Sequence, residues 1–239
     1  MAAAGVSAYS RAMDQFTADA STRLTAIHDR IAAATRLAAR NADAVELIAV
    51  SKTFDAAAIR PFLAAGQRSF GENRVQEAGE KWPGLRADFA DARLHLVGQL
   101  QSNKAADAVA LFDVIHAVDR VSLIDALARA MTTRRPDCYV QVNIGNEPQK
   151  AGCSVADLPA LLAHARGVGL PVIGLMAVPP AGIEAAPFFA LLAKLARDHA
   201  LTQLSMGMSD DFETAIMLGA TAVRVGSALF GARGGGVTI

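Results

Sequence analysis

The stretch ELIAVSKTF, residues 46–54, decides the fold, because it joins a buried-strand pattern to a polar end. Four of its first five residues are apolar, which is typical of a strand that is covered on both faces. The run then ends on Ser51 and Lys52. A lysine at that place is either a solvated strand end or a chemical group, and the stretch alone leaves both interpretations open.

Seven more runs of this kind follow, and Ala- and Leu-rich helical patterns fill the gaps between them. The eight predicted strands are residues 46–52, 68–73, 93–98, 114–119, 138–144, 171–178, 201–207 and 222–226. Continuous apolar parallel strands need both faces covered, and the eighth strand can pair with the first. The sequence therefore predicts an α/β fold, a single (β/α)8 TIM barrel.

We expect one domain over residues 1–239, because a chain with 52% hydrophobic residues can bury one large core and no linker interrupts the pattern. Apolar residues recur at steps of three and four through the first forty positions, which predicts an additional helix within residues 1–45. The glycine-rich end, residues 232–239, is predicted to be a flexible tail. Asp55 and Ser122 are predicted to begin helices, and Gly66 and Gly219 to close them.

Composition excludes several classes of partner. Lys and Arg number 23, as do Asp and Glu, so no basic field recruits nucleic acid or a membrane surface. No apolar run is long enough to span a bilayer, and we expect a soluble, cytoplasmic protein. Cys138 and Cys153 are too few for a disulfide framework and lack zinc spacing, so we expect ordinary thiols. The histidines show no metal-ligand spacing, and His95 and His116 are expected to be barrel-wall residues.

Polar residues gather where the predicted strands end, which in a barrel is the face that carries the chemistry. Barrel closure sets the first strand beside the eighth and brings Lys52 near Arg224. Next to a fixed guanidinium in a water-poor site, the ammonium form of a lysine is disfavoured. That environment makes the amine nucleophilic, so the site favours Lys52 as a chemical group.

Two loops with glycine and serine follow the last two predicted strands, SMGMSDD at 205–211 and RVGSALFG at 224–231. Loops at this place usually hold phosphate in a TIM barrel, through helix N-terminal amides and hydroxyls. A phosphate beside a nucleophilic lysine suggests pyridoxal 5′-phosphate, whose aldehyde forms a Schiff base with a lysine. Asp210 and Asp211 are expected to cap the helix after the first loop rather than to form an acid pair.

Motifs along the chain resemble those of the pyridoxal phosphate homeostasis proteins, the family that includes the proline synthetase co-transcribed homologue type. The matching segments, in order, are AVSKT (49–53), FGENRVQE (70–77), HLVGQLQSNK (95–104), IHAVD (115–119), VQVNI with EPQKAGC (140–153), GLMAV (174–178), SMGMSDDFETAI (205–216) and GATAVRVGSALFG (219–231). They span nearly the whole chain after residue 45. The resemblance implies a fold like the barrel domain of alanine racemase standing alone.

The resemblance also implies the roles of individual residues. It implies that Lys52 carries the cofactor as a Schiff base. The other implied site residues are Arg224 at the pyridine nitrogen, Asn73 and Met176 beside the ring, and Ser209, Gly226 and Ser227 at the phosphate. Because a guanidinium can only donate hydrogen bonds, Arg224 would keep the ring nitrogen unprotonated and make the cofactor a weaker electron sink.

Three functions remain open at this point. The leading hypothesis is a protein that holds, buffers and delivers pyridoxal phosphate, with the apo forms of enzymes that use this cofactor as partners. The alternatives are a weak amino acid racemase and a scaffold with a vestigial site. A racemase needs a second acid/base on the opposite face of the substrate, and the two tyrosines, Tyr9 and Tyr139, are expected far from the mouth.

Three further expectations follow. Gln99 stands where the family often has histidine. Lys150 is kept as a candidate for a ligand or cofactor-transfer role. The absence of a racemase-type second domain favours a monomer.

Overall fold

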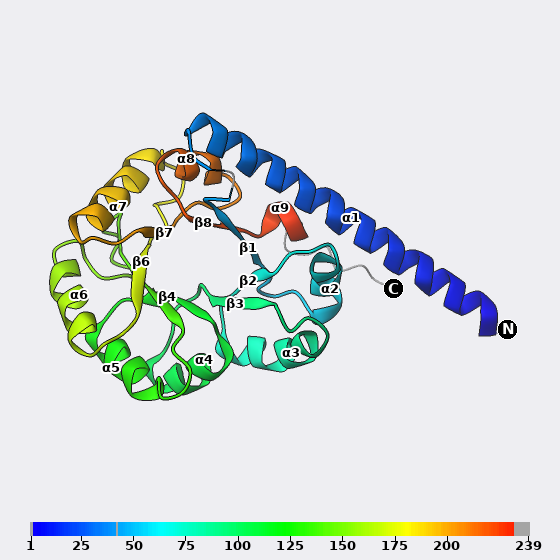
Figure 1. Cartoon of the computed structure of the whole chain (residues 1–239), viewed down its shortest axis with the longest axis horizontal. Coiled ribbons are helices and arrows are strands. Elements are labelled where there is room, and N and C mark those ends of the chain that lie inside the picture. Colours follow the sequence, from blue (N-terminus) through cyan, green and yellow to red (C-terminus); the bar gives the residue numbers. More distant parts are fainter. Residues whose placement is uncertain (1, 42, 232–239) are drawn as a thin grey trace.

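Eight parallel strands form a closed barrel in chain order, as Figure 1 shows. This computed structural model describes the backbone of residues 2–41 and 43–231 and the side chains of residues 18–41 and 43–231. The strands are β1 Glu46–Val50, β2 Ser69–Glu72, β3 Arg93–Leu96, β4 Val114–Val118, β5 Asp137–Gln141, β6 Val172–Met176, β7 Gln203–Ser205 and β8 Ala222–Val225. The predicted barrel is confirmed. Most predicted strands run too far at their C-terminal ends, because the chain leaves the sheet there to form the loops of the mouth.

Helices fill the predicted gaps between the strands and cover the outside of the barrel (Figure 1). They are α1 Ala2–Leu37, α2 Ala56–Ala64, α3 Val75–Asp88, a 3-10 turn at Ser102–Lys104, α4 Ala105–Leu111, α5 Val121–Ala130, α6 Leu158–Gly167, α7 Ala186–Asp198, α8 Phe212–Met217 and α9 Ser227–Phe230. Asp55 caps α2 as predicted, by accepting a hydrogen bond from the amide of Ala58. Gly66 and Gly219 follow α2 and α8 with left-handed φ angles of 99° and 103°.

One helix start differs from the prediction, and one helix runs past a proline. α5 begins at Val121 after the extended Arg120, so Ser122 lies inside the helix and does not cap it. α3 continues past Trp82 and through Pro83 to Asp88. Trp82 and Leu85 are both buried on this helix, so packing against the barrel extends it further than the local sequence pattern indicates.

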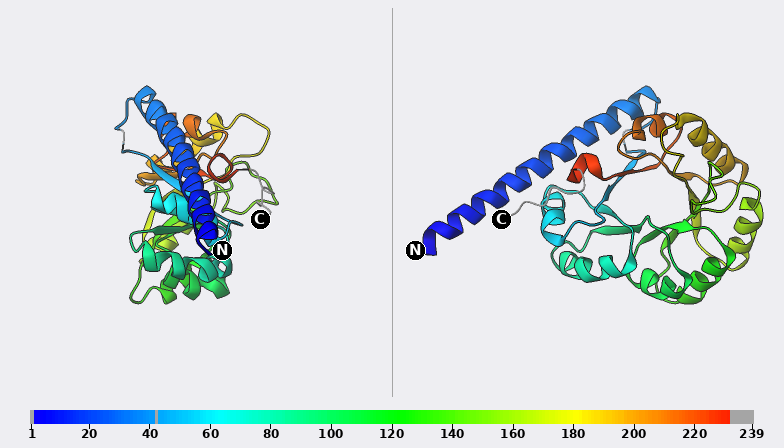
Figure 2. Two further views of the ribbon diagram at one scale, coloured as in Figure 1. Left: turned by 90° about the vertical axis from the view of Figure 1, so that its right-hand side faces the viewer. Right: turned by 180° about the vertical axis from the view of Figure 1, so that it is seen from behind.

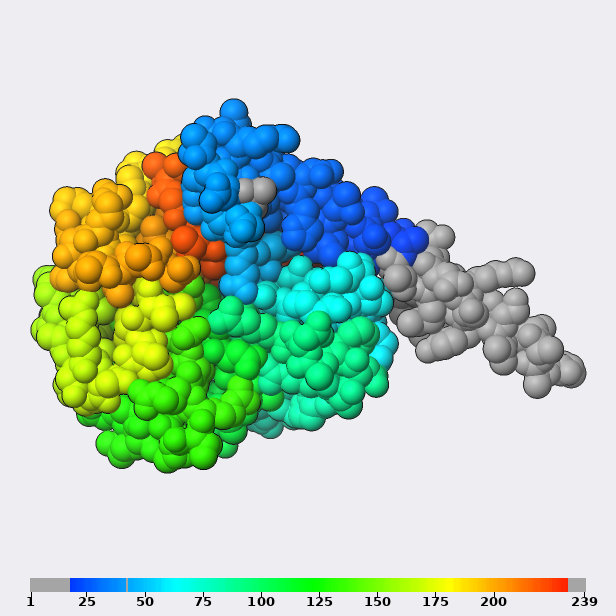
Figure 3. Space-filling view, in the orientation of Figure 1, coloured from blue at the N-terminus to red at the C-terminus, as the bar shows by residue number. Residues whose placement is uncertain are grey.

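The predicted N-terminal helix is confirmed as α1, which crosses the outside of the barrel where β8 meets β1. Figures 2 and 3 show it running along one side of the molecule, and it contacts α8, α2 and α9. Leu24, Ile27 and Ile31 are buried at that contact. The guanidinium of Arg23 donates to the carbonyl of Leu229 in α9 at 3.0 Å, so α1 also supports the final turn of the chain.

The sequence also gives expectations about the thiols, membrane-spanning helices, metal sites and the C-terminal tail. Cys138 and Cys153 are buried free thiols, and burial raises the pKa of both, that of Cys153 to about 12. Within the described residues, no helix is both long and apolar enough to cross a membrane. The same part of the chain holds no group of His, Cys, Asp or Glu suited to a metal ion. The predicted tail, residues 232–239, lies outside the described residues.

Candidate functional site

A cavity of about 450 Å³ lies at the C-terminal ends of the strands, which we call the mouth cavity. Its lining residues are Val50, Lys52, Thr53, Phe54, Asn73, Val97, Val178, Met208, Ser209, Asp210, Arg224, Gly226, Ser227 and Gly231. They come from the C-terminal parts of β1 and β8 and from the segments that follow β1, β2, β3, β6, β7 and β8. The cavity therefore stands where a TIM barrel carries its chemistry.

Six of the seven residues predicted for the site lie in this lining, namely Lys52, Asn73, Ser209, Arg224, Gly226 and Ser227. Met176 does not line the cavity and is 1% exposed, packed with Val114 and Tyr139 in the lumen of the barrel. It is the last residue of β6, and Val178 lines the cavity instead. Side chains two residues apart face the same way, so the prediction selected the layer below the mouth.

Lys52 and Arg224 reach the same cavity from different depths. In the pairing of β1 with β8, Arg224 lies opposite Ile48, four residues before Lys52. The long side chain of Arg224 spans that offset, whereas Lys52 is half-buried in the loop at the rim. Closure of the barrel thus joins the two cations in one cavity, as predicted, although they do not face each other across the strand ladder.

Arg224 is 4% exposed and held by two uncharged acceptors. Its Nη1 donates to the Ser205 hydroxyl at 2.6 Å and its Nη2 to the Ala177 carbonyl at 2.9 Å. Burial lowers the pKa of Arg224 to about 10, partly offset by Asp211 and Tyr139, so the side chain stays cationic at neutral pH. These two bonds use two of the five guanidinium N–H groups. Among the described residues no hydrogen bond to the remaining N–H groups is seen, so they can serve an acceptor in the mouth cavity.

The loop that carries Lys52 is strained and firmly held. Thr53 has a left-handed φ of 68°, a conformation that costs a β-branched residue roughly 1–3 kcal/mol. Its amide donates to Oε1 of Glu77 at 2.7 Å. The ammonium of Lys81 donates to the carbonyls of Ser51 and Phe54, at 3.1 and 2.8 Å. Both ends of the turn around Lys52 are therefore fixed by side chains from α3.

We call Ser51, Glu72, Glu77, Lys81 and Trp82 the Glu72 network. Glu72 is fully buried, and its Oε1 accepts from the Ser51 hydroxyl at 2.6 Å and from the Trp82 indole at 3.0 Å. Lys81, whose side chain is 9% exposed, lies 2.9 Å from the same oxygen and 3.0 Å from Glu77. A buried carboxylate with this many partners is a rigid element of the fold.

Sequence reasoning missed the Glu72 network. The spacing of Glu77 and Lys81, four apart on one helix, was a visible signal for an ion pair. Glu72 and Asn73 also stand together at the end of a predicted strand, but nothing local indicates that Glu72 points outward to Trp82 while Asn73 lines the mouth cavity.

Close backbone contacts fix the other walls of the mouth cavity. A Cβ at Gly98 would lie 2.3 Å from the carbonyl oxygen of Asn73, so only glycine lets the end of β3 approach that residue so closely. Phe54 stacks on Phe230 with ring centroids 4.9 Å apart, which joins the Lys52 loop to α9. The loop after β7 passes through Gly207, whose φ is 92°.

The acidic pair at the start of α8 differs in part from its prediction. The Asp211 carboxylate accepts from the amide of Met208 at 2.6 Å and makes no side-chain bond to the amides of α8. Asp211 therefore closes the loop that presents Ser209, rather than capping the helix. Burial raises the pKa of Asp211, with its neighbour Asp210 contributing in the same direction. Asp210 lines the mouth cavity.

The comparisons with known proteins agree with this geometry. The sequence profile of the alanine racemase N-terminal domain matches residues 23–234. A pyridoxal phosphate homeostasis protein of Pseudomonas aeruginosa is 44% identical over 214 residues, which are 85% of this chain and 91% of the relative. This chain belongs to the pyridoxal phosphate homeostasis protein family. The homologue of Escherichia coli K12, of the same name, is 36% identical over 90% of this chain and 97% of its own length.

A solved structure adds a ligand to the family. PipY of Synechococcus elongatus PCC7942, solved with pyridoxal phosphate bound, superimposes with a TM-score of 0.72 at 43% identity. The match covers 86% of this chain and 100% of that chain. The resemblance stated from the sequence motifs is thereby confirmed at the level of family and fold.

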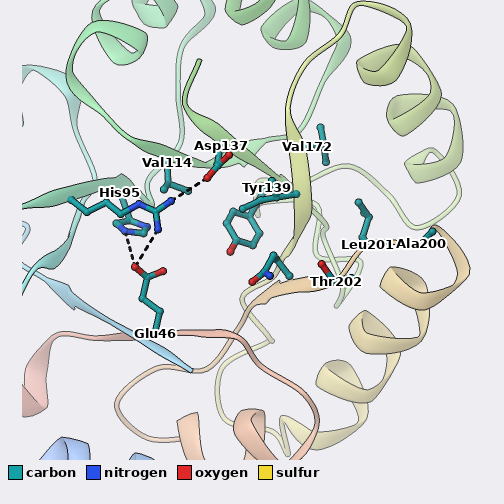
Figure 4. A pocket seen from close by; sticks show the side chains of 12 residues that line it. Glu46, His95, Val114, Asp137, Tyr139, Val172, Ala200, Leu201 and Thr202 are labelled. Atoms are coloured by element: carbon teal, nitrogen blue, oxygen red, sulfur yellow. Dashed lines mark hydrogen bonds and ion pairs between the residues drawn. The ribbon is translucent and has the colours of Figure 1, made fainter. Parts of the chain in front are cut away.

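A second cavity, of about 530 Å³, lies at the N-terminal ends of the strands, and we call it the floor cavity (Figure 4). Its lining residues are Glu46, Arg93, His95, Val114, Asp137, Tyr139, Val172, Ile173, Ala200, Leu201, Thr202 and Gln203. Arg93 lies 3.6 Å from Glu46 and 3.1 Å from Asp137. Tyr139 is here, which confirms that it stands at the end of the barrel opposite the mouth.

Gln99 and Lys150, the two other positions noted in the sequence, lie outside the lining of the mouth cavity. Gln99 is exposed, and it is Gly98 that lies against Asn73. Lys150 donates to the carbonyl of Pro179 at 3.0 Å and lies 2.6 Å from Oε2 of Glu147. These two contacts fix Lys150 to the loops that follow β5 and β6.

Proposed function

We propose that this protein binds pyridoxal 5′-phosphate in the mouth cavity, with Lys52 as its covalent Schiff-base attachment, and that it serves to hold, buffer and deliver the cofactor. One observation carries the proposal: the closed barrel brings Lys52 and Arg224 into a single cavity with two serine-bearing loops. Relatives at 34–44% identity are named as homeostasis proteins for this cofactor.

The donor groups of the cavity fit such a ligand. The hydroxyls of Ser209 and Ser227, with Gly226 between the last strand and α9, suit a phosphate group. The uncommitted N–H groups of Arg224 suit a neutral ring nitrogen. Val97 and Val178 supply apolar lining for the faces of the ring, and Asn73 a polar edge.

The residues favour retention of the cofactor over rapid turnover. Bound pyridoxal phosphate supplies an aldehyde carbon that condenses with amines and a ring that withdraws electrons. Arg224 would donate a hydrogen bond to the ring nitrogen, and because a guanidinium does not give up its proton at neutral pH, that nitrogen would stay unprotonated and electron withdrawal would be limited. Tyr139 lies at the floor of the barrel and cannot act as a second acid/base at the mouth.

The attachment is tested by reduction. The purified protein is loaded with pyridoxal phosphate, reduced with borohydride and digested, and the pyridoxyl group is located by mass spectrometry. We expect the adduct on Lys52 and its loss in Lys52→Ala. Lys150→Ala is the matched control, because Lys150 is also half-buried near the mouth but outside the cavity lining. An adduct on another lysine in the wild type, or no retained cofactor, contradicts the proposal.

Delivery is tested separately. The loaded protein is mixed with the apo form of an enzyme that uses pyridoxal phosphate, and recovery of activity is compared with that from free cofactor at equal concentration. Faster recovery in the presence of a trap for free pyridoxal phosphate supports direct transfer. Recovery abolished by the trap indicates buffering alone. A cytoplasmic location and a monomeric state remain predictions, to be checked by fractionation and by light scattering.

A weak amino acid racemase is the second candidate, favoured by the match to the alanine racemase N-terminal domain. Exchange of the α-hydrogen of amino acids in deuterated water separates the two functions. Rapid exchange by the wild type that is lost in Lys52→Ala favours the enzyme. Exchange no faster than with free cofactor favours the binding protein.

A further inference from the structure

Four buried polar side chains run through the lumen of the barrel, from the mouth cavity towards the floor cavity. They are Arg224 on β8, Ser205 on β7, His116 on β4 and His95 on β3, all at most 4% exposed. Ser205 Oγ lies 2.9 Å from Nδ1 of His116. Nε2 of His116 lies 3.0 Å from Nδ1 of His95. At the floor, Nε2 of His95 faces Oε1 of Glu46 at 3.5 Å (Figure 4).

The mouth end of this series fixes the direction of the hydrogen bonds in it. At the mouth, the guanidinium of Arg224 can only donate, so Ser205 Oγ accepts from it. At the floor, Nε2 of His95 has no hydrogen-bond partner among the described residues, and Oε1 of Glu46 lies 3.5 Å from it as an electrostatic neighbour. The direction of the hydrogen bonds is therefore set from Arg224 inward.

The positions of the protons on Ser205, His116 and His95 follow by elimination. Among the described residues, Ser205 Oγ has no partner besides Arg224 and His116, so its hydroxyl proton is donated to Nδ1 of His116. Burial keeps the pKa of His116 well below its ordinary value, and the charges of Arg224 and Arg93 act in the same sense. Neutral His116 then carries its proton on Nε2 and donates it to Nδ1 of His95. The proton of a neutral His95 then lies on Nε2, on the side of Glu46 but without a hydrogen bond to it.

A protonated His95 would break this pattern. Its Nδ1 proton would point at Nε2 of His116 and force the His116 proton onto Nδ1. Ser205 would then receive two donors and be left with a hydroxyl proton that has no acceptor, which is costly in a fully buried site. Stacking of His116 on Tyr139, with ring centroids 4.4 Å apart and planes 13° apart, holds the imidazole in the orientation that the series requires.

We propose that Ser205, His116 and His95 form a one-directional hydrogen-bond series that positions the guanidinium of Arg224 for the ligand in the mouth cavity. The three lumen residues act through Arg224 and do not touch the ligand, so they are positioning residues. The inference rests on the proposed function for the identity of that ligand, but the direction of the series is a property of the protein itself.

The direction is measured on the protein without cofactor. Exposed or half-buried His28, His164 and His199 are replaced by Gln, which leaves His95 and His116 as the only histidines. Nitrogen-15 NMR of the labelled variant then reports both tautomers. We expect two neutral rings at neutral pH, each with its proton on Nε2. A charged ring, or a proton on either Nδ1, overturns the proposal, and this holds even if pyridoxal phosphate does not bind.

The effect on Arg224 is measured with the cofactor. His95→Leu removes the acceptor for His116, whereas His95→Asn keeps an oxygen near the place of Nδ1. Gln203→Ala, in the floor lining but outside the series, is the control. We expect about tenfold weaker retention of pyridoxal phosphate and a shifted absorption band in His95→Leu, with about threefold or less in His95→Asn and the control.

The outcomes separate the two proposals. A wild type without the Lys52 adduct refutes the proposed function but leaves the NMR result on the series standing. A wild type with the adduct, together with an unchanged absorption band and affinity in His95→Leu, refutes the positioning role. Equal losses in His95→Leu and His95→Asn refute it as well, because they indicate a merely structural contribution of the ring.

Discussion

The two ends of the barrel carry cavities of similar size, about 450 Å³ at the mouth and 530 Å³ at the floor, yet they differ in how their arginines are neutralised. At the floor, Arg93 lies between the carboxylates of Glu46 and Asp137. At the mouth, Arg224 is bonded to a hydroxyl and a carbonyl. The larger cavity has already paired its charges, whereas the smaller one offers a cation to a ligand. Charge pairing, rather than volume, distinguishes the binding end.

The ion pairs that support each end also differ in burial. Lys81 and Glu72, behind the Lys52 loop, have side chains that are 9% and 0% exposed. Arg93 and Asp137, at the floor, are 42% and 40% exposed. Because solvent screens exposed pairs, removal of one partner costs far more when the other is left buried without a counter-charge. The mouth should therefore be the more sensitive end.

The largest effect is expected for Lys81→Met. It leaves the Glu72 carboxylate buried without its cation and frees the carbonyls of Ser51 and Phe54, so unfolding should become easier by about 3 kcal/mol. Urea unfolding followed by circular dichroism measures the change. The floor counterpart Arg93→Met and the exposed Lys104→Met serve as controls, with losses of about 1 kcal/mol or less. Equal losses in Lys81→Met and Arg93→Met would remove the contrast between the two ends.

Gly98→Ala should have the next largest effect, and it acts on the mouth alone. The added Cβ would lie 2.3 Å from the carbonyl oxygen and 2.7 Å from Cα of Asn73, so that backbone must move. We expect a loss of about 2 kcal/mol in the free energy of unfolding, together with weaker retention of pyridoxal phosphate. Gly84→Ala is the matched control, because a Cβ there meets nothing within 4 Å. Unchanged cofactor retention in Gly98→Ala would show that the position of Asn73 is not critical.

A smaller effect, present at neutral pH and disappearing in acid, is expected at the floor for Glu46→Gln. The folded-state pKa of Glu46 is about 2 against an ordinary 4.5, so the carboxylate stabilises the fold above pH 4.5. That contribution is lost as the pH falls from 4.5 towards 2. Glu46→Gln lacks it at every pH and should show a flatter decline over this window, with a loss of about 1 kcal/mol at neutral pH after screening. Parallel curves for the two proteins, from unfolding at several pH values, would contradict the assignment.

The sequence predicts the barrel and most of the mouth because both depend on strand ends. Strands are visible in the sequence as apolar runs, and in a barrel their C-terminal ends converge on one face. These two facts were sufficient to predict that Lys52, Asn73 and Arg224 lie together. Met176 lies one layer below the cavity lining, because the depth of a side chain depends on where its strand leaves the sheet.

The supporting networks could not be predicted in this way. The contact of His116 with Ser205 joins positions 89 residues apart, and it exists only for one register of the strands and one choice of lumen side chains. Glu72 likewise binds Trp82 through packing that no local pattern specifies. In both cases a buried polar residue in a strand is the visible signal, and the partner becomes known only from the fold.

Tyr139→Phe should have the smallest effect on the mouth and sharpens the comparison from the floor side. Burial, with a further contribution from Glu46, raises the pKa of Tyr139 to about 12, so the phenol stays protonated at neutral pH and cannot serve as a base. Phenylalanine keeps the stacking surface for His116, and cofactor retention should change by less than about twofold. A large loss of retention, or of α-hydrogen exchange if the wild type shows any, would mean that the hydroxyl itself matters to the mouth. Either result would extend the influence of the floor beyond the hydrogen-bond series that ends on His95.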